Sequence, residues 1–362
     1  MEKIQEIQAA LKKQKIDAAL LINTTIKDPN MLYLTNLELE YSFLLIPKNS
    51  EAIFCVSALE YERAKKYSAI KNVIKFQKPL KEIKNLLKGK TTIGLNEAYI
   101  TLATKKTLEK EWKGKKYKPT DMIYKTARII KTQDEAQKLQ KAAAIADKIF
   151  EELTKELQTN RSMFKTEKDI AEFIDQRAKK WGDGSSFETI VASGKNAALP
   201  HYVPQNVPIQ KGFCVLDFGV RYKNYISDIS RTIFFGAPTK EEITNYTKVK
   251  NANERAINEL KIGRKLKDID KRSRKEFNYP HSLGHGIGVE VHEAPNVSPK
   301  SKDTIKENMC FTIEPGMYVP EKFGIRIEDD IWMTKNNTVQ LTKSTKELLC
   351  FQDYSYSLKK SP

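Results

Sequence analysis

The residues that could do chemistry gather in one part of this sequence. All four histidines fall between positions 201 and 292, and three lie in one stretch, His281-Ser-Leu-Gly-His285-Gly-Ile-Gly-Val-Glu-Val-His292. Four acids flank this stretch, in the order Asp217, Asp228, Glu314 and Glu328. Histidine is the usual neutral ligand and proton carrier near pH 7. Histidines gathered among carboxylates therefore predict a hydrolytic metal site.

Asp217 and Asp228 are expected on neighbouring strands. Val-Leu-Asp217-Phe-Gly alternates like a strand, Arg221-Tyr-Lys-Asn has the residues of a turn, and Tyr225-Ile-Ser-Asp228 begins the return strand. A hairpin would bring both carboxylates onto one face. Two carboxylates in an apolar strand pair need a cation between them, or one must hold a proton. For this pair taken by itself, two solvated aspartates at a sheet edge remain the alternative.

Glu314 and Glu328 pose the same problem, since each is an acid within an apolar strand pattern. Acids are almost never fully buried unless paired. Four acids and one histidine would form a site that suits manganese, cobalt or zinc better than magnesium. A single ion would leave much negative charge uncompensated. Two divalent ions are therefore expected, and they could share a bridging hydroxide and polarise a carbonyl.

The histidines divide by their surroundings. His285 is the expected metal ligand, because the glycines on either side would let the backbone approach a metal closely. His201, His281 and His292 would surround the site as proton carriers or as donors to a developing oxyanion. One histidine in such a place is more often a core residue. Four in one region, with none elsewhere, favour catalysis.

These motifs resemble those of the pita-bread-fold metallopeptidases, in the prolidase (Xaa-Pro dipeptidase) and aminopeptidase P branch. That family orders its ligands Asp, Asp, His, Glu, Glu, with the two aspartates 11 positions apart, as here. The matching motifs are Asp217-Phe-Gly, Gly-His285-Gly-Ile-Gly, Thr-Ile-Glu314-Pro-Gly and Arg326-Ile-Glu328. The resemblance covers residues 125–350 and extends more weakly to the N-terminal part.

The resemblance implies hydrolysis of the imide bond before proline in Xaa-Pro dipeptides, with a metal-bridging hydroxide as nucleophile. It makes Asp228 and Glu328 ligands of both ions, Asp217 a ligand of one, and His285 with Glu314 ligands of the other. Glu314 would also take the proton from the bridging water.

The resemblance also assigns the residues around the metals. His201 and His292 match histidines that contact substrate and stabilise the tetrahedral intermediate. His281 and Arg326 match positions that support the proline end. The segment from 261 to 281 looks shorter than is usual in the family, where it lies beside the pocket.

Three alternatives stay open. An aminopeptidase P would remove the first residue from longer X-Pro peptides, and the sequence does not distinguish it from a dipeptidase. A methionine aminopeptidase is disfavoured by the additional N-terminal domain. A non-enzymatic peptide- or protein-binding relative is disfavoured because such relatives typically lose ligands, and here all five are present.

The elements that must position these residues predict an α+β protein. Residues 1–124 alternate short strands with helices, as in a small creatinase-like α/β domain, and residues 125–352 would form the catalytic pita-bread domain. Capping-box spacings predict helix starts at Thr132, Thr166 and Thr239. Strands are expected at 213–219, 224–235, 309–319 and 323–334, and a frayed tail at 353–362.

Composition limits the partners and the compartment. The net charge is +17, but 52 lysines stand against 11 arginines and are spread along the whole chain, which disfavours specific nucleic-acid binding. No apolar run is long enough to span a membrane, and the N-terminus has no apolar signal core. The four cysteines show neither metal nor disulfide spacing. A cytoplasmic enzyme is expected, and by resemblance a homodimer.

Overall fold

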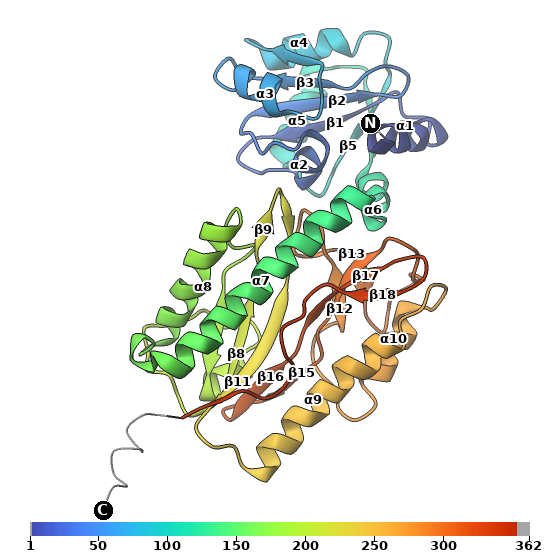
Figure 1. Ribbon diagram of the computed structural model, residues 1–362. Helices are drawn as coiled ribbons and strands as arrows, with labels where there is room; N and C mark the ends of the chain where they lie inside the picture. Colours follow the sequence, from blue (N-terminus) through green and yellow to red (C-terminus); the bar gives the residue numbers. More distant parts are fainter. Residues whose placement is uncertain (1, 353–362) are drawn as a thin grey trace, which may run out of the picture. The chain divides into compact units, whose positions relative to one another are not determined.

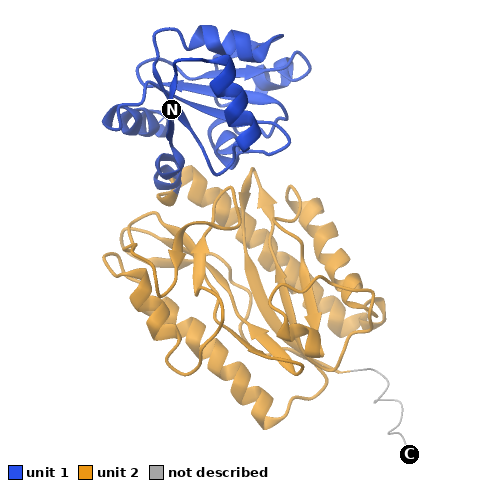
Figure 2. Ribbon diagram, turned by 180° about the vertical axis from the view of Figure 1, so that it is seen from behind, with its two compact units in different colours: residues 1–128 blue, residues 129–362 orange. Residues whose placement is uncertain are grey.

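The chain folds into two compact units. The computed structural model describes residues 2–352, and its packing divides the chain into residues 1–128 and 129–362 (Figure 2). The first unit alternates strands with helices, and the second combines long helices with mostly antiparallel strands. This arrangement confirms the predicted α+β class. The tail predicted at 353–362 lies outside the described residues. None of the described helices is long and apolar enough to cross a membrane.

The first unit is a mixed sheet with helices packed on it (Figure 1). The strands lie in the order β4-β3-β2-β1-β5-β6, with β1 antiparallel to β2 and parallel to β5. The strands are β1 (Ala18–Asn23), β2 (Ser42–Pro47), β3 (Ile53–Val56), β4 (Val73–Lys75), β5 (Thr92–Leu95) and β6 (Lys116–Pro119). The helices are α1 (Glu2–Lys13), α2 (Pro29–Thr35), α3 (Tyr61–Tyr67), α4 (Pro79–Leu86), α5 (Leu102–Glu111) and α6 (Asp121–Ile129).

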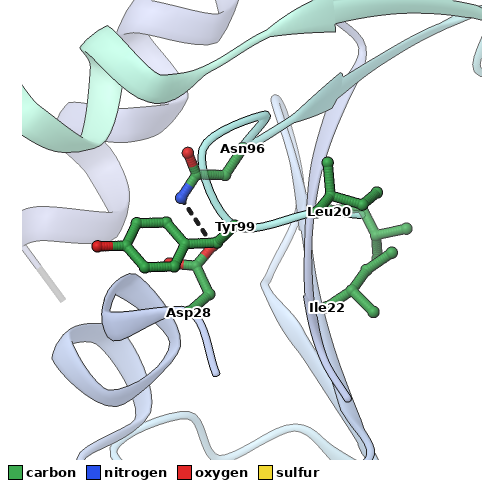
Figure 3. A pocket seen from close by; sticks show the side chains of 6 residues that line it. Leu20, Ile22, Asp28, Asn96 and Tyr99 are labelled. Carbon is green, nitrogen blue, oxygen red and sulfur yellow. Dashed lines mark hydrogen bonds between the residues drawn. The ribbon is translucent and has the colours of Figure 1, made fainter. Parts of the chain in front are cut away.

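A buried carboxylate in this unit is enclosed by amides. Asp28, which caps α2, is 3% exposed. Its Oδ1 accepts hydrogen bonds from the backbone and side-chain amides of Asn30, and its Oδ2 accepts one from Asn96 at 2.8 Å (Figure 3). Asp28 and Asn96 help to line a cavity of about 10 Å³, which is room for a single water molecule at most.

The described part of the second unit, up to residue 352, contains two larger sheets and two short hairpins. The larger sheets have the strand orders β19-β11-β8-β7 and β13-β12-β14-β17-β18, and the short pairs are β9-β10 and β15-β16. The strands are β7 (Ile190–Ser193), β8 (Gly212–Phe218), β9 (Arg221–Tyr222), β10 (Tyr225–Ile226), β11 (Ile229–Phe235), β12 (Gly284–Gly286), β13 (Glu293–Val297), β14 (Cys310–Ile313), β15 (Gly316–Val319), β16 (Phe323–Arg326), β17 (Asp329–Met333), β18 (Thr338–Gln340) and β19 (Cys350–Phe351).

Helices cover these sheets, and three of the four named here have 15 residues or more (Figure 1). They are α7 (Gln133–Thr159), α8 (Glu167–Trp181), α9 (Lys240–Asn258) and α10 (Leu266–Ser273). Apolar side chains of α7 and α8 pack on β8 and β11, whereas α10 and the end of α9 pack on β14 and β17. The starts of α7, α8 and α9 are the predicted capping boxes, in which each threonine and the acid three residues later satisfy each other's backbone N–H groups.

Three strands predicted as continuous are broken, and this corrects the sequence-based expectation. The patterns at 224–235, 309–319 and 323–334 predict single strands, but the structure divides each one, at Asp228, Glu314 and Glu328. On the two sides of each break the chain belongs to different sheets: β10 pairs with β9 but β11 with β8, and β14 pairs with β17 but β15 with β16. Each acid therefore stands where the chain crosses from one sheet to another.

Candidate metal centre

The two aspartates are brought together by a tight hairpin. Lys223 and Asn224 form its turn with φ of 48° and 69°, the left-handed conformation that a two-residue hairpin of type I′ requires. Asp217 lies in β8 directly opposite Ser230 of β11, and Asp228 comes two residues before Ser230. Asp217 and Asp228 are therefore diagonal neighbours across the strand pair, at a spacing that side chains can bridge.

His285 lies among three of the acids. Its Nε2 is 3.3 Å from Oε1 of Glu314, 3.7 Å from Oδ2 of Asp228 and 3.9 Å from Oε1 of Glu328. One potential ligand atom each from Asp228, His285 and Glu328 lie within 4.8 Å of one another. Residues that are 100 positions apart in the chain are thus assembled around one imidazole.

The glycines beside His285 allow close packing of strands. A Cβ at Gly284 would lie 1.9 Å from the carbonyl oxygen of Thr312, and one at Gly286 would lie 2.1 Å from that of Ala294. No side chain fits at such distances, so β12 could not enter its sheet without both glycines. The glycines position the imidazole through strand packing, which is a different reason from the close approach to a metal suggested by the sequence.

Several acid oxygens in this cluster are buried without a hydrogen-bond partner among the described residues, namely Asp217 Oδ1, Asp228 Oδ1 and Glu328 Oε1. Burial, together with the charges of Glu328 and Asp217, raises the pKa of Asp228 well above its usual range. Burial and the charges of Glu314 and Asp217 do the same to the pKa of Glu328. The protein therefore packs several carboxyl groups so closely that they disfavour one another's charged form.

Glu314 and His285 behave as a pair. Burial acts to raise the pKa of Glu314, but the contact with His285, together with the charges of His281 and Arg326, lowers that pKa. Burial acts to lower the pKa of His285, but the contact with Glu314, together with backbone hydrogen bonds to Gly286 and Val291, raises that pKa. Glu314 is thus held in its carboxylate form, as a metal ligand must be.

Arg326 ties the acids to their surroundings. Its Nη2 donates to Oδ2 of Asp217 at 2.5 Å, its Nε donates to Oγ of Ser230 at 2.8 Å, and its Nη1 donates to the hydroxyl of Tyr318 at 2.9 Å. Ser230 in turn donates to Oε2 of Glu328 at 2.9 Å. One guanidinium thus fixes Asp217 directly and Glu328 through Ser230.

His281 lies on the other side of Glu314. Its Nδ1 is 3.9 Å from Oε2 of Glu314, and its Nε2 is 3.1 Å from the hydroxyl of Tyr318. Burial lowers the pKa of His281, so the imidazole is neutral near pH 7 and offers one donor and one acceptor. Tyr318 therefore connects His281 to Arg326.

His292 and His201 are exposed at the edge of the cluster. The ring of His292 is 4.2 Å from that of His285, centroid to centroid, at an interplanar angle of 74°. Partial burial and the neighbouring His285 lower the pKa of His292, and the charge of His201 acts in the same direction. The residue before His201 is also anchored here, since the carbonyl oxygen of Pro200 accepts from Nη1 of Arg326 at 3.2 Å.

An open groove begins at His281. Its volume is about 700 Å³, which is within the range of small-ligand pockets. The lining is polar and partly cationic, and it comprises Arg274, Asn278, Tyr279, Pro280, His281, Ser282, Asn296, Ser298, Pro299 and Lys300. Arg274 and residues 278–281 of this lining belong to the segment from 261 to 281, which looks short in the sequence.

The donor set fits divalent cations. It offers carboxylates and one imidazole, which suits manganese, cobalt or zinc, and it contains buried oxygens and raised pKa values that a cation would relieve. The structure gathers all five residues predicted as ligands. Ser230 and Tyr318 could not be identified from the sequence, because a serine or tyrosine within a strand does not by itself indicate a functional site.

The comparisons agree with this geometry. Residues 137–335 match metallopeptidase family M24, and residues 3–130 match the creatinase/prolidase N-terminal domain. A Pyrococcus furiosus protein named Xaa-Pro dipeptidase is 35% identical over 96% of this chain and 99% of that protein. The solved prolidase of Pyrococcus horikoshii OT3 has a TM-score of 0.88 at 36% identity, covering 96% and 100% of the two chains. The X-Pro aminopeptidase of Thermotoga maritima MSB8 has a TM-score of 0.84 at 31% identity, covering 93% and 98%.

These matches confirm the resemblance inferred from the motifs. They also confirm the fold, in which a creatinase-like N-terminal domain precedes a pita-bread metallopeptidase domain. The family match extends across the whole acid and histidine cluster, from Asp217 to Glu328. With more than half of the chain matched and the cluster assembled, the protein belongs to metallopeptidase family M24.

Proposed function

We propose that the enzyme is a prolidase, which hydrolyses the imide bond before proline in Xaa-Pro dipeptides. The observation that carries this proposal is the cluster of buried, unpartnered acid oxygens around His285, in a chain that is similar over its full length to proteins named Xaa-Pro dipeptidase. Metallopeptidases of this family use divalent metal. The proposed cofactor is two divalent ions per subunit, manganese or cobalt, with zinc as the third choice.

The five proposed ligands are Asp217, Asp228, His285, Glu314 and Glu328. Asp228 and Glu328 would contact both ions, Asp217 one, and His285 with Glu314 the other. Two ions held in this way would polarise the scissile carbonyl and lower the pKa of a water molecule between them.

Glu314 is the proposed proton acceptor. It takes a proton from the attacking water as the new C–O bond forms at the carbonyl carbon before proline. When the C–N bond breaks, the same proton passes to the proline nitrogen, which leaves as a neutral secondary amine. Glu314 suits this role because it faces His285 on one side and His281 on the other.

The histidines and Arg326 complete the proposed site. His292 and His201 donate hydrogen bonds to the oxyanion of the tetrahedral intermediate, which their exposed position at the edge of the cluster permits. His281 and Arg326, joined through Tyr318, support the proline end. Since proline has no N–H and a fixed ring, a rigid wall is a suitable means of recognising it.

The test is a comparison of two substrates. The protein, purified without metal and loaded with Mn²⁺ or Co²⁺, is incubated with Met-Pro and with Met-Pro-Gly, and free methionine is measured. Cleavage of Met-Pro that a chelator abolishes and added metal restores supports the prolidase assignment. Metal bound at stoichiometric level with neither peptide cleaved would overturn it.

The second candidate is an aminopeptidase P. The groove beside His281 favours it, because the groove is open and could hold residues beyond proline. Preference for Met-Pro-Gly over Met-Pro in the same assay would select this activity.

We also propose the roles of the two domains, the oligomeric state, the location and the partners. Residues 1–124 act as a creatinase-like N-terminal domain and 125–352 as the catalytic domain of a cytoplasmic homodimer. Short peptides are the expected partners, and no specific nucleic acid or membrane is expected. Size measurement in solution tests the dimer.

A further inference from the structure

Asn253 is a buried polar residue on the apolar face of α9. Its exposure is 0%, and its neighbours Val249, Ala252 and Ala256 on that face are equally buried. Asparagine is less favourable than alanine in a helix interior, and burial of its amide is costly unless its donors and acceptor are bonded. An asparagine at this position therefore calls for a specific set of partners.

The Asn253 amide donates to two different strands. Its Nδ2 lies 2.9 Å from the carbonyl oxygen of Ile313 and 3.3 Å from that of Ile327. The residues that follow these two carbonyls are Glu314 and Glu328. Both hydrogens of one amide thus go to the peptide bonds that precede two proposed metal ligands.

The nitrogen ends of the same peptide bonds are held as well. The N–H of Glu314 donates to the carbonyl oxygen of Leu283 at 2.7 Å, and the N–H of Glu328 donates to that of Ser230 at 3.1 Å. A planar peptide unit that is bonded at both its oxygen and its nitrogen has a fixed orientation. That orientation sets the direction in which the following glutamate side chain leaves the backbone. The peptide units need to be fixed in this way because both strands break at these two glutamates, so the strand ladder does not hold the backbone there.

The orientation of the Asn253 amide is fixed in turn. Its Oδ1 accepts from Nζ of Lys346 at 2.7 Å, and the same Nζ lies 2.7 Å from Oδ2 of Asp329. Lysine can only donate, so the amide oxygen must face it and the NH₂ group must face the two carbonyls. Asp329 also pairs with Arg231, whose Nη1 donates to the carbonyl oxygen of Glu328 at 2.6 Å. The hydrogen bonds that start at Asn253 and Lys346 therefore lead back to Glu328, one of the proposed metal ligands.

We propose that Asn253 is a positioning residue of the metal centre, which sets the placement of Glu314 relative to Glu328. Lys346 keeps the amide in the orientation that this task requires. The inference rests on the proposed function, because it takes both glutamates to be metal ligands. Removing an outer contact of this kind typically weakens metal binding by about 10–100-fold.

The test variant is Asn253→Asp, which keeps the shape of the side chain but has no N–H to donate. Binding of Co²⁺ to the full chain is measured by competition with a chelator, and the visible absorption bands of bound Co²⁺ report its coordination geometry. The dissociation constant is expected to rise by about 10–100-fold, with altered absorption bands.

The matched control is Asn23→Asp in the first unit. Asn23 is 1% exposed, its Nδ2 donates to the carbonyl oxygen of Leu39, and its Oδ1 accepts from the N–H of Asp28. This control loses the same kind of buried donor far from any proposed ligand in the sequence. It is expected to lower the melting temperature and to leave Co²⁺ affinity and absorption unchanged.

A folded Asn253→Asp variant that binds Co²⁺ as tightly as the wild type, with the same bands, would overturn the proposal. If that variant does not fold, Lys346→Met removes the orienting contact instead. It is expected to weaken Co²⁺ binding less than Asn253→Asp, whereas Lys346→Arg keeps a donor and a charge and should restore affinity. Wild-type affinity in Lys346→Met would count against the proposal. Absence of metal binding by the wild type itself would instead contradict the proposed function.

Discussion

Two aspartates, one in each unit, are equally buried but differently surrounded. Asp28 in the first unit is 3% exposed; its Oδ1 accepts from the amides of Asn30. Its Oδ2 accepts from the side-chain amide of Asn96 (Figure 3). Asp228 in the second unit is 4% exposed, lies among other acids, and has an Oδ1 without a hydrogen-bond partner among the described residues.

The contrast shows what distinguishes a structural acid from a candidate metal ligand. Burial raises the pKa of both residues, but the Asn96 and Asn30 amides act against this at Asp28, whereas Glu328 and Asp217 add to it at Asp228. Asp28 and Asp228 are thus both buried, and they differ in the groups that surround their carboxylates. Amide donors complete the first site from within the protein, and the second site requires cations from outside.

The largest expected difference between the two regions is in catalysis. Glu314→Gln removes a proposed ligand and the proposed proton acceptor, so kcat for Met-Pro should fall by at least about 10³-fold. Asp28→Asn, the same acid-to-amide change in the first unit, should leave kcat unchanged. Steady-state assays of both variants at saturating metal check this, and a nearly normal kcat for Glu314→Gln would remove its proposed role.

His292 should affect turnover more than metal binding. His292→Ala removes a proposed donor to the oxyanion but no proposed ligand, so kcat should fall by about 10²–10⁴-fold while metal content stays near that of the wild type. Metal analysis alongside the assay separates the two effects. Loss of metal in proportion to loss of activity would make His292 a structural support of the centre instead.

Asp28 should matter for stability. Asp28→Asn replaces an acceptor of three amide hydrogen bonds by a side chain with a single acceptor oxygen. The free energy of unfolding should fall by about 1–3 kcal/mol, because buried donors are left unsatisfied. Urea unfolding followed by circular dichroism measures this. An unchanged midpoint would mean that the amides around Asp28 find other partners.

The smallest predicted effect is the change in melting temperature caused by Asp228→Asn, which should be an increase without metal and a decrease with metal. In chelator, Asp228→Asn removes one of several mutually repelling acids, so the melting temperature should rise by roughly 2–4 °C, or about 1 kcal/mol. With saturating Mn²⁺ the wild type should be the more stable protein, because metal bound to the folded state alone stabilises it. Paired melting curves test this, and a lower melting point for the variant in chelator would contradict the idea of uncompensated charge.

Features that depend on residues close together in the chain could be predicted from the sequence. The capping boxes at Thr132, Thr166 and Thr239 form as expected, since the two partners of each are three residues apart. The acids and His285 were identifiable because buried acids and clustered histidines are rare in a chain.

The breaks at Glu314 and Glu328 were not predictable in this way. The apolar pattern continues across them, and only the pairing of distant strands decides where a ladder ends. Ser230, Tyr318 and Asn253 escaped notice for the same reason. Each is an ordinary residue of its strand or helix, and its importance arises from partners at least 37 positions away, apart from the Tyr318–Arg326 contact.

The order in which the chain is made bears on when this site can form. Cys350 and Phe351 of β19 pair with Phe234 and Phe235 of β11, and Lys346 reaches Asn253 from just before β19. Contacts between such distant positions form slowly, and domains fold in turn from the N-terminal end during synthesis. Residues 1–128 form a compact unit by themselves. During synthesis the first unit can therefore fold before the second, and the network that holds Glu314 and Glu328 cannot be complete until residues 346–351 have been made and have packed, so metal capture at the proposed site follows that packing.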